Sequence, residues 1–142
     1  MMKNVLCAID GSRASQRAVD FAVGMAANFG AAVRFITVTA VTQASAAKSP
    51  FWDTRLFDAG ETLIAREQTH AMETAAAKGV TNASCATVNG RDVATAIVAY
   101  AQEHGFDHIV MGTSGHSVLE RLLTGSVVDD VLNQPHPPVT VV

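Results

Sequence analysis

Short apolar runs alternate with longer amphipathic stretches along the chain. The runs are rich in β-branched residues and bounded by turn residues, which is typical of buried strands in a parallel sheet. They cover residues 5–9, 32–39, 83–88, 108–111 and 139–142. The stretches between them predict helices at 12–29, 56–78, 93–104 and 126–132. This alternation predicts an α/β fold in which helices cover both faces of a parallel sheet.

Two of the predicted helices carry an apolar stripe that we expect to face the core. In the first helix the stripe consists of Ala14, Ala18, Phe21, Met25 and Phe29. In the third helix it consists of Val93, Ile97, Tyr100 and His104. The small and polar segment at about 40–56 contains a proline and predicts a variable loop instead.

Composition narrows the class of protein. The 142 residues fit a single domain over 1–142, and 49% of them are hydrophobic. The net charge of −3 argues against a nucleic-acid ligand. No apolar run approaches the roughly 18 residues that span a bilayer, and the first run is too short for a signal peptide. We therefore expect no membrane insertion and a cytoplasmic location. Cys7 and Cys85 each lie in an apolar run, which predicts buried thiols without a disulfide.

The candidate chemistry lies after the fourth predicted strand. Gly112 and Gly115 follow that strand directly, and nine residues later Gly125 and Ser126 precede the last predicted helix. Glycine lets a ligand approach the backbone, and the free amides at a helix start favour an anion, commonly phosphate. A turn that serves the fold alone has no need of three glycines and a serine at this spacing. The segment therefore favours a phosphate site.

Other nucleotide and catalytic motifs do not fit the sequence. No glycine precedes a lysine, so there is no Walker A loop, and the turn after the first strand lacks the dinucleotide fingerprint. The turn at Gly112 is similar to a nucleophile elbow, but His116 stands where that pattern requires glycine. His104 and His108 are separated by Gly105, so we expect that they do not share a helix face as a metal pair.

The spacing Gly112-x2-Gly115-x9-Gly125-Ser126 is the G-x2-G-x9-G-[S/T] motif of the ATP-binding branch of the universal stress protein family, which this sequence resembles. Residues 5–12 and 138–142 are similar to the family's opening and closing strands. The resemblance implies a Rossmann-like (adenine nucleotide alpha hydrolase-like) fold of three α/β/α layers. Its five-stranded parallel sheet would have the order 3-2-1-4-5. It also implies a homodimer formed through the last strand, from Val139 to Val142.

The resemblance further implies an ATP site whose residues can be carried over one by one. In chain order they are Ala8, Ile9, Asp10, Val38, Met111, Gly112, Gly115, His116, Gly125, Ser126 and Val127. The glycines and Ser126 match the phosphate and ribose cradle, and the backbone of Val38 matches the partner of adenine. Asp10 matches an acid that contacts the ribose or a phosphate-bound metal.

The four-residue turn departs from the family by lacking a basic residue, since Thr113 and Ser114 are neutral and the three lysines of the chain lie away from the motifs. We therefore predict that Mg²⁺ or Mn²⁺ accompanies ATP, with Asp10 as its protein ligand. Only His116 and Asp10 could act as a general base, so turnover should be slow or absent. The leading prediction is an ATP-binding regulatory or sensor protein in stress response that acts on a regulatory protein partner. The alternatives are a slow ATPase or phosphotransfer enzyme on the same site, and a dimeric interaction module without nucleotide.

Overall fold

The strands form one parallel sheet, as the alternation predicts. The computed structural model describes residues 2–40, 54–113 and 127–142, and within them the strand order is β3-β2-β1-β4-β5, with every pairing parallel. The strands are β1 (Asn4–Ala8), β2 (Ala32–Thr39), β3 (Ala83–Asn89), β4 (His108–Met111) and β5 (Val139–Val141). The helices are α1 (Arg13–Phe29), α3 (Thr54–Ala77), α4 (Val93–Glu103) and α6 (Val127–Leu132). The predicted order 3-2-1-4-5 is confirmed.

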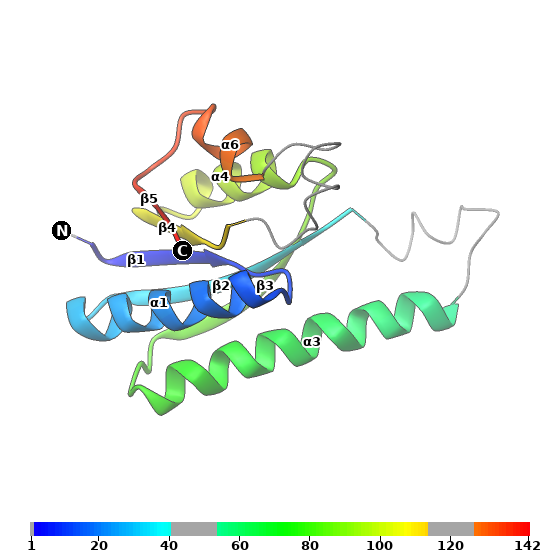
Figure 1. Ribbon diagram of the computed structural model, residues 1–142, viewed down its shortest axis with the longest axis horizontal. Helices are drawn as coiled ribbons and strands as arrows, with labels where there is room; N and C mark the ends of the chain where they lie inside the picture. Colours follow the sequence, from blue (N-terminus) through cyan, green and yellow to red (C-terminus); the bar gives the residue numbers. More distant parts are fainter. Residues whose placement is uncertain (1, 41–53, 114–126) are drawn as a thin grey trace.

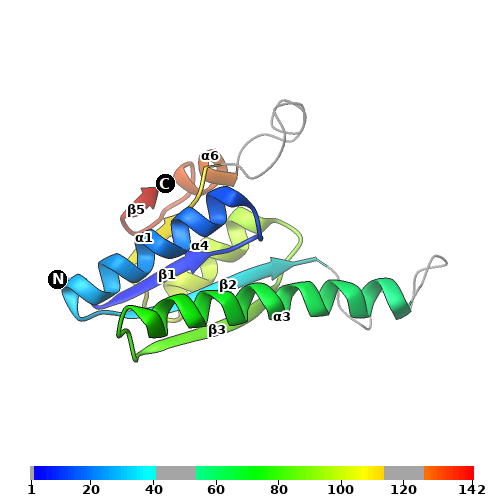
Figure 2. The ribbon, with the colours of Figure 1, turned by 60° about the horizontal axis from the view of Figure 1, so that its bottom comes forward.

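Helices cover both faces of the sheet, which gives three layers (Figure 1). Successive residues of a strand point to opposite faces, so β1 contributes Val5 and Cys7 to one core and Leu6 to the other. The first core packs against α1 and α3, and the second against α4 and α6. The amino-terminal turns of α3 reach beyond the end of β2 in both views (Figures 1 and 2).

Helix α1 buries a different stripe from the predicted one. Ala14 and Ala18 are buried as expected, but Phe21 and Phe29 are 46% and 60% exposed, and Met25 is only partly buried. The buried face consists of Ala14, Ser15, Ala18, Val19, Ala22, Val23 and Ala26. These residues are small, so the helix can approach the sheet more closely than a face containing phenylalanine would allow.

Helix α4 is also rotated relative to the prediction. Ile97 is buried, but Val93 is 40% exposed and His104 lies exposed at the carboxyl end of the helix. The core face consists of Ala94, Ile97, Val98 and Ala101. Tyr100 and His104 do share a side, where their rings stack with centroids 4.0 Å apart. Because His108 lies in β4, the two histidines do not share a helix face, as predicted.

The helix ends follow local signals in the sequence. Ser12 caps α1, and the carboxylate of Asp92 caps α4 by accepting the N–H of Thr95 at 2.9 Å. Hydrogen bonds from the backbone and the side chain of Thr95 lower the pKa of Asp92. Helix α3 starts at Thr54, two residues before its predicted start, and the predicted loop at 41–53 lies outside the described residues.

The two cysteines are free, as predicted. Cys7 is buried and Cys85 is half-buried, and burial raises the pKa of both thiols. Among the described helices, none is both long and apolar enough to cross a bilayer.

Candidate functional site

A cavity of about 560 Å³ opens at the carboxyl ends of β1, β2 and β4, beside α4 and the start of α6. Its described lining consists of Ala8, Ile9, Asp10, Gly11, Ser12, Ser15, Ile36, Val38, Val93, Ile97, Met111, Gly112, Thr113, Val127 and Val128. The strand order reverses between β1 and β4, which makes this edge the switch point where open α/β sheets bind ligands.

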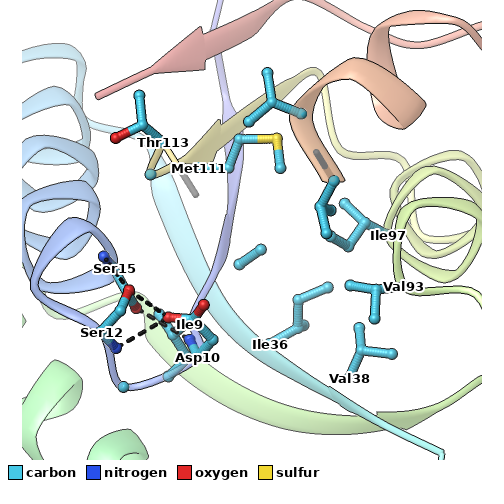
Figure 3. Close-up of a pocket in the computed structure, with 15 residues that line it drawn as sticks. Ile9, Asp10, Ser12, Ser15, Ile36, Val38, Val93, Ile97, Met111 and Thr113 are labelled. Carbon is cyan, nitrogen blue, oxygen red and sulfur yellow. Dashed lines mark hydrogen bonds between the residues drawn. The ribbon is translucent and has the colours of Figure 1, made fainter. Parts of the chain in front are cut away.

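One side of the cavity is apolar. Ile36 and Val38 are two residues apart on β2 and point to the same face, while Val93 and Ile97 lie one turn apart on α4 (Figure 3). Met111 adds a thioether from the end of β4. Branched aliphatic walls of this kind suit a flat, uncharged ring system.

The opposite side is polar and is built by the turn between β1 and α1 (Figure 3). Asp10 Oδ1 accepts the Ser12 N–H at 3.0 Å and the Ser12 hydroxyl at 2.6 Å. The Asp10 N–H donates to Ser15 Oγ at 3.1 Å, and Ser12 Oγ accepts the Ser15 N–H at 3.1 Å. Gly11 has a φ of +82°, a left-handed conformation that favours glycine. The turn therefore fixes the exposed Asp10 carboxylate, whose Oδ2 accepts no hydrogen bond within the described residues.

The described polar side carries negative charge. Asp10 is the one ionisable residue in the described lining, which contains no lysine or arginine. A second carboxylate, that of Glu67 on α3, lies against Gly11 from outside the cavity. Partial burial, and then the charge of Asp10, raise the pKa of Glu67 above its usual range. This end of the cavity therefore suits hydroxyl groups or cations better than bare phosphate.

The structure brings together seven of the eleven site residues expected from the sequence. Those that line the cavity are Ala8, Ile9, Asp10, Val38, Met111, Gly112 and Val127. The other four, Gly115, His116, Gly125 and Ser126, lie outside the described residues. The lining also includes residues that the sequence reasoning missed: Ser15, Ile36, Val93, Ile97, Thr113 and Val128. Ile36 could have been found, because it lies two positions before Val38 on the same strand face.

Gly112 has a structural role that the sequence analysis did not foresee. A Cβ at this position would lie 2.6 Å from the backbone carbon and oxygen of Ala14 and 2.9 Å from its Cβ. The first turn of α1 therefore passes too close for any side chain at position 112. The fold therefore requires glycine at position 112 whatever the ligand.

The described residues offer no metal site made by protein alone. No group of three or more His, Cys, Asp or Glu side chains among them could hold an ion. Asp10 provides a single carboxylate whose Oδ2 accepts no hydrogen bond from the described residues, and Mg²⁺ uses such a ligand when substrate phosphates and water complete its shell. A metal here would therefore arrive with a phosphate ligand.

The fold and the cavity together define a Rossmann-like α/β protein with a ligand cleft at its switch point. The sequence model of the universal stress protein family matches residues 1–142, and the chain belongs to that family.

Relatives of the chain agree with this assignment. A universal stress protein of Methanocaldococcus jannaschii is 49% identical over 49 residues, which are 34% of this chain and 29% of the relative. A Staphylococcus haemolyticus protein assigned to the same family is 27% identical over 139 residues, 98% of this chain and 82% of the relative. A solved structure of a universal stress protein in complex with cAMP is 30% identical, with a TM-score of 0.78, over 99% of this chain and 96% of that one. The match thus spans less than a third of the first relative and most of the other two.

Proposed function

We propose that this chain is a regulatory protein that binds an adenine nucleotide, with ATP as the physiological ligand. The observation that carries the proposal is the cavity of about 560 Å³, with one apolar and one polar side, at the switch point of the sheet. The similar protein of known structure binds cAMP, an adenine nucleotide, which supports the class of ligand.

The two sides of the cavity suggest how a nucleotide would lie. The adenine ring would lie against the apolar side formed by Ile36 and Val38 of β2 and Val93 and Ile97 of α4. The sugar would then lie toward Asp10, whose Oδ2 can accept a hydroxyl hydrogen or bind a phosphate-bound Mg²⁺. The glycine turns of the family motif would hold the phosphates through their amides.

Catalysis is a lesser part of the proposal. Asp10 is the one described lining residue able to act as a base, and its Oδ1 is already bound by Ser12. Only Oδ2 is then left to act on water, and the described lining offers no cationic side chain to stabilise the charge that develops during phosphoryl transfer. We therefore expect ATP to be held with slow hydrolysis or none, so the protein acts as a sensor through what it contacts.

The experiment that tests the proposal is calorimetric titration of nucleotide-stripped protein with ATP and Mg²⁺, beside two tryptophan variants of α4. Val93→Trp places an indole in the cavity, whereas Thr95→Trp places one on the exposed side of the same helix, outside the lining. We expect about one ATP per parent chain, a loss of affinity of at least roughly tenfold in Val93→Trp, and none in Thr95→Trp.

Three outcomes separate the candidate functions. Binding by the parent that is lost only in Val93→Trp supports the nucleotide proposal, and phosphate release from the same sample then tests for an ATPase. Equal binding by both tryptophan variants would place the ligand elsewhere. No binding by the folded parent would favour an interaction module without nucleotide.

We also propose a homodimer through β5. This strand lies at the edge of the sheet, and an exposed edge strand can pair with another chain. The Val142 N–H donates inward to the Met111 carbonyl at 2.9 Å, so by alternation the N–H of Val141 points outward. Val141→Pro removes this outward donor and leaves the inward ladder intact. Light scattering should then show a monomer, whereas an unchanged dimer would contradict pairing through this edge.

A further inference from the structure

Helix α3 crosses the turn that forms the polar side of the cavity. Both carboxylate oxygens of Glu67 lie within 3.2 Å of the position that a Cβ on Gly11 would occupy. Gly11 itself lines the cavity, next to Asp10. The place of the side chain that Gly11 lacks is thus filled by the carboxylate of Glu67, brought from a distant part of the chain.

This carboxylate has no compensating cation in the described part of the protein. No lysine, arginine or histidine among residues 2–40, 58–113 and 127–142 forms an ion pair or hydrogen bond with Glu67. Partial burial raises the pKa of Glu67, and the charge of Asp10, which has the same sign, raises it further. Two carboxylates of like sign therefore border the polar side, one inside the cavity and one just behind its wall.

We propose that Glu67 is a specificity-determining residue of the cavity, one that discriminates among adenine ligands by their negative charge. The inference rests on the proposed function, because it assumes that a nucleotide occupies the cavity. The apolar side of the cavity, where the adenine ring would lie, does not distinguish ligands by their phosphate charge. The repulsion from Glu67, in contrast, grows with each negative charge that reaches the polar side. A neutral nucleoside is not repelled, a cyclic monophosphate is repelled through its single negative charge, and free ATP is repelled most strongly.

The test is a charge series measured on three proteins. Adenosine, cAMP and ATP are titrated calorimetrically into parent, Glu67→Gln and Glu73→Gln in chelator at low ionic strength. Glu73 is an exposed residue of the same helix, so its variant makes the same change in net charge away from the cavity. We expect Glu67→Gln to leave adenosine affinity unchanged, to raise cAMP affinity about twofold and to raise ATP affinity about five- to tenfold.

Two further measurements separate charge from packing. Glu67→Asp keeps the charge and shortens the side chain, so its affinity ratios across the ligands should resemble those of the parent. Adding Mg²⁺ neutralises part of the ATP charge and should shrink the gain in Glu67→Gln for ATP while leaving the cAMP ratio unchanged. A packing role would change all ligands alike in both variants.

The results distinguish the inference from the proposal beneath it. If the parent binds all three ligands and Glu67→Gln changes them by one common factor, Glu67 does not select by charge, and nucleotide binding still stands. The role of Glu67 is equally wrong if Glu73→Gln reproduces the series, since the effect would then come from net charge alone. If the folded parent binds none of the three ligands either in chelator or with Mg²⁺, both the proposed function and the role of Glu67 are wrong.

Discussion

Replacing Gly112 by alanine tests the close approach between the glycine turn and helix α1. The new Cβ would lie 2.6 Å from the backbone carbon and oxygen of Ala14, whereas ordinary contact begins at 3.4 Å, so the two segments must separate by about 0.8 Å. Backbone cannot rotate away as a flexible side chain can, and shifts of this kind in packed interiors cost about 1–3 kcal/mol. We expect the free energy of unfolding to fall by about 2 kcal/mol.

Gly24 provides the matched control for this substitution. It lies inside α1, and a Cβ there would meet no atom within 4 Å. Alanine favours a helix interior over glycine by about 0.8–1 kcal/mol, so Gly24→Ala should stabilise the protein. The same chemical change therefore has opposite signs at two positions. For a domain of this size, the two variants should melt roughly 8 °C below and 3 °C above the parent.

The assay is urea unfolding followed by far-ultraviolet circular dichroism, with equal m-values required before the free energies are compared. A Gly112→Ala protein within about 0.5 kcal/mol of the parent would refute the close approach. Adding Ala14→Gly should restore little stability, since the backbone of Ala14 is the main obstacle. Ser12 and Ser15 belong to the displaced turn, so nucleotide binding should weaken as well. Lost binding in this variant would not by itself prove contact between Gly112 and phosphate.

Three other predictions concern single side chains. The buried hydroxyl of Thr37 has no hydrogen-bond partner within the described residues, so Thr37→Val should raise the free energy of urea unfolding by about 1 kcal/mol; a loss of stability would show that the hydroxyl is satisfied. Burial lowers the pKa of His108 despite the opposing charge of Asp107, and His108 Nε2 lies 2.7 Å from Thr140 Oγ1. The unfolded chain then binds the proton more tightly, so stability should fall as the pH drops through about 6.5 toward the folded pKa, and His108→Gln should flatten this slope. An unchanged slope would assign it to other groups. The pKa of Glu67 is raised, so ionisation of Glu67 destabilises the folded state at pH values above that pKa. Glu67→Gln should therefore be at least as stable as the parent at pH 7, and the difference should vanish in acid. Lower stability of Glu67→Gln at pH 7, measured in the same urea assay, would contradict this cause.

The strands were predictable because their signal is local and redundant, whereas their order was implied by the family resemblance. Each buried strand is a short apolar run, and the alternation with helices leaves few topologies. Residues adjoining those strand ends, such as Asp10 and Met111, line the cavity. The family motif predicted Gly112 as a binding residue, and the structure shows that a side chain at this position would also collide with Ala14.

The contact between Glu67 and Gly11 could not be read from the sequence. The contact depends on where α3 crosses the turn after β1, and the sequence of α3 does not show which of its residues lies beside that turn. The apolar stripe of this helix is weak, since its described residues supply only Ala71 and Ala75 to the buried core. The contacts of such a helix are determined by tertiary packing, and the spacing of its polar residues does not predict them.

The wrong stripe on α1 and the unexpected role of Gly112 have one physical cause. Two stripes of α1 begin with Ala14 and Ala18, and periodicity alone cannot choose between a continuation through Phe21 and one through Ala22. The larger side chains offer more apolar area to bury, so hydrophobicity alone favours them. However, α1 passes so close to Gly112 that Ala14 occupies the space a Cβ at position 112 would need. A phenylalanine on that face would push the helix away and break this contact, so the small stripe packs inward and the glycine and the alanines depend on one another.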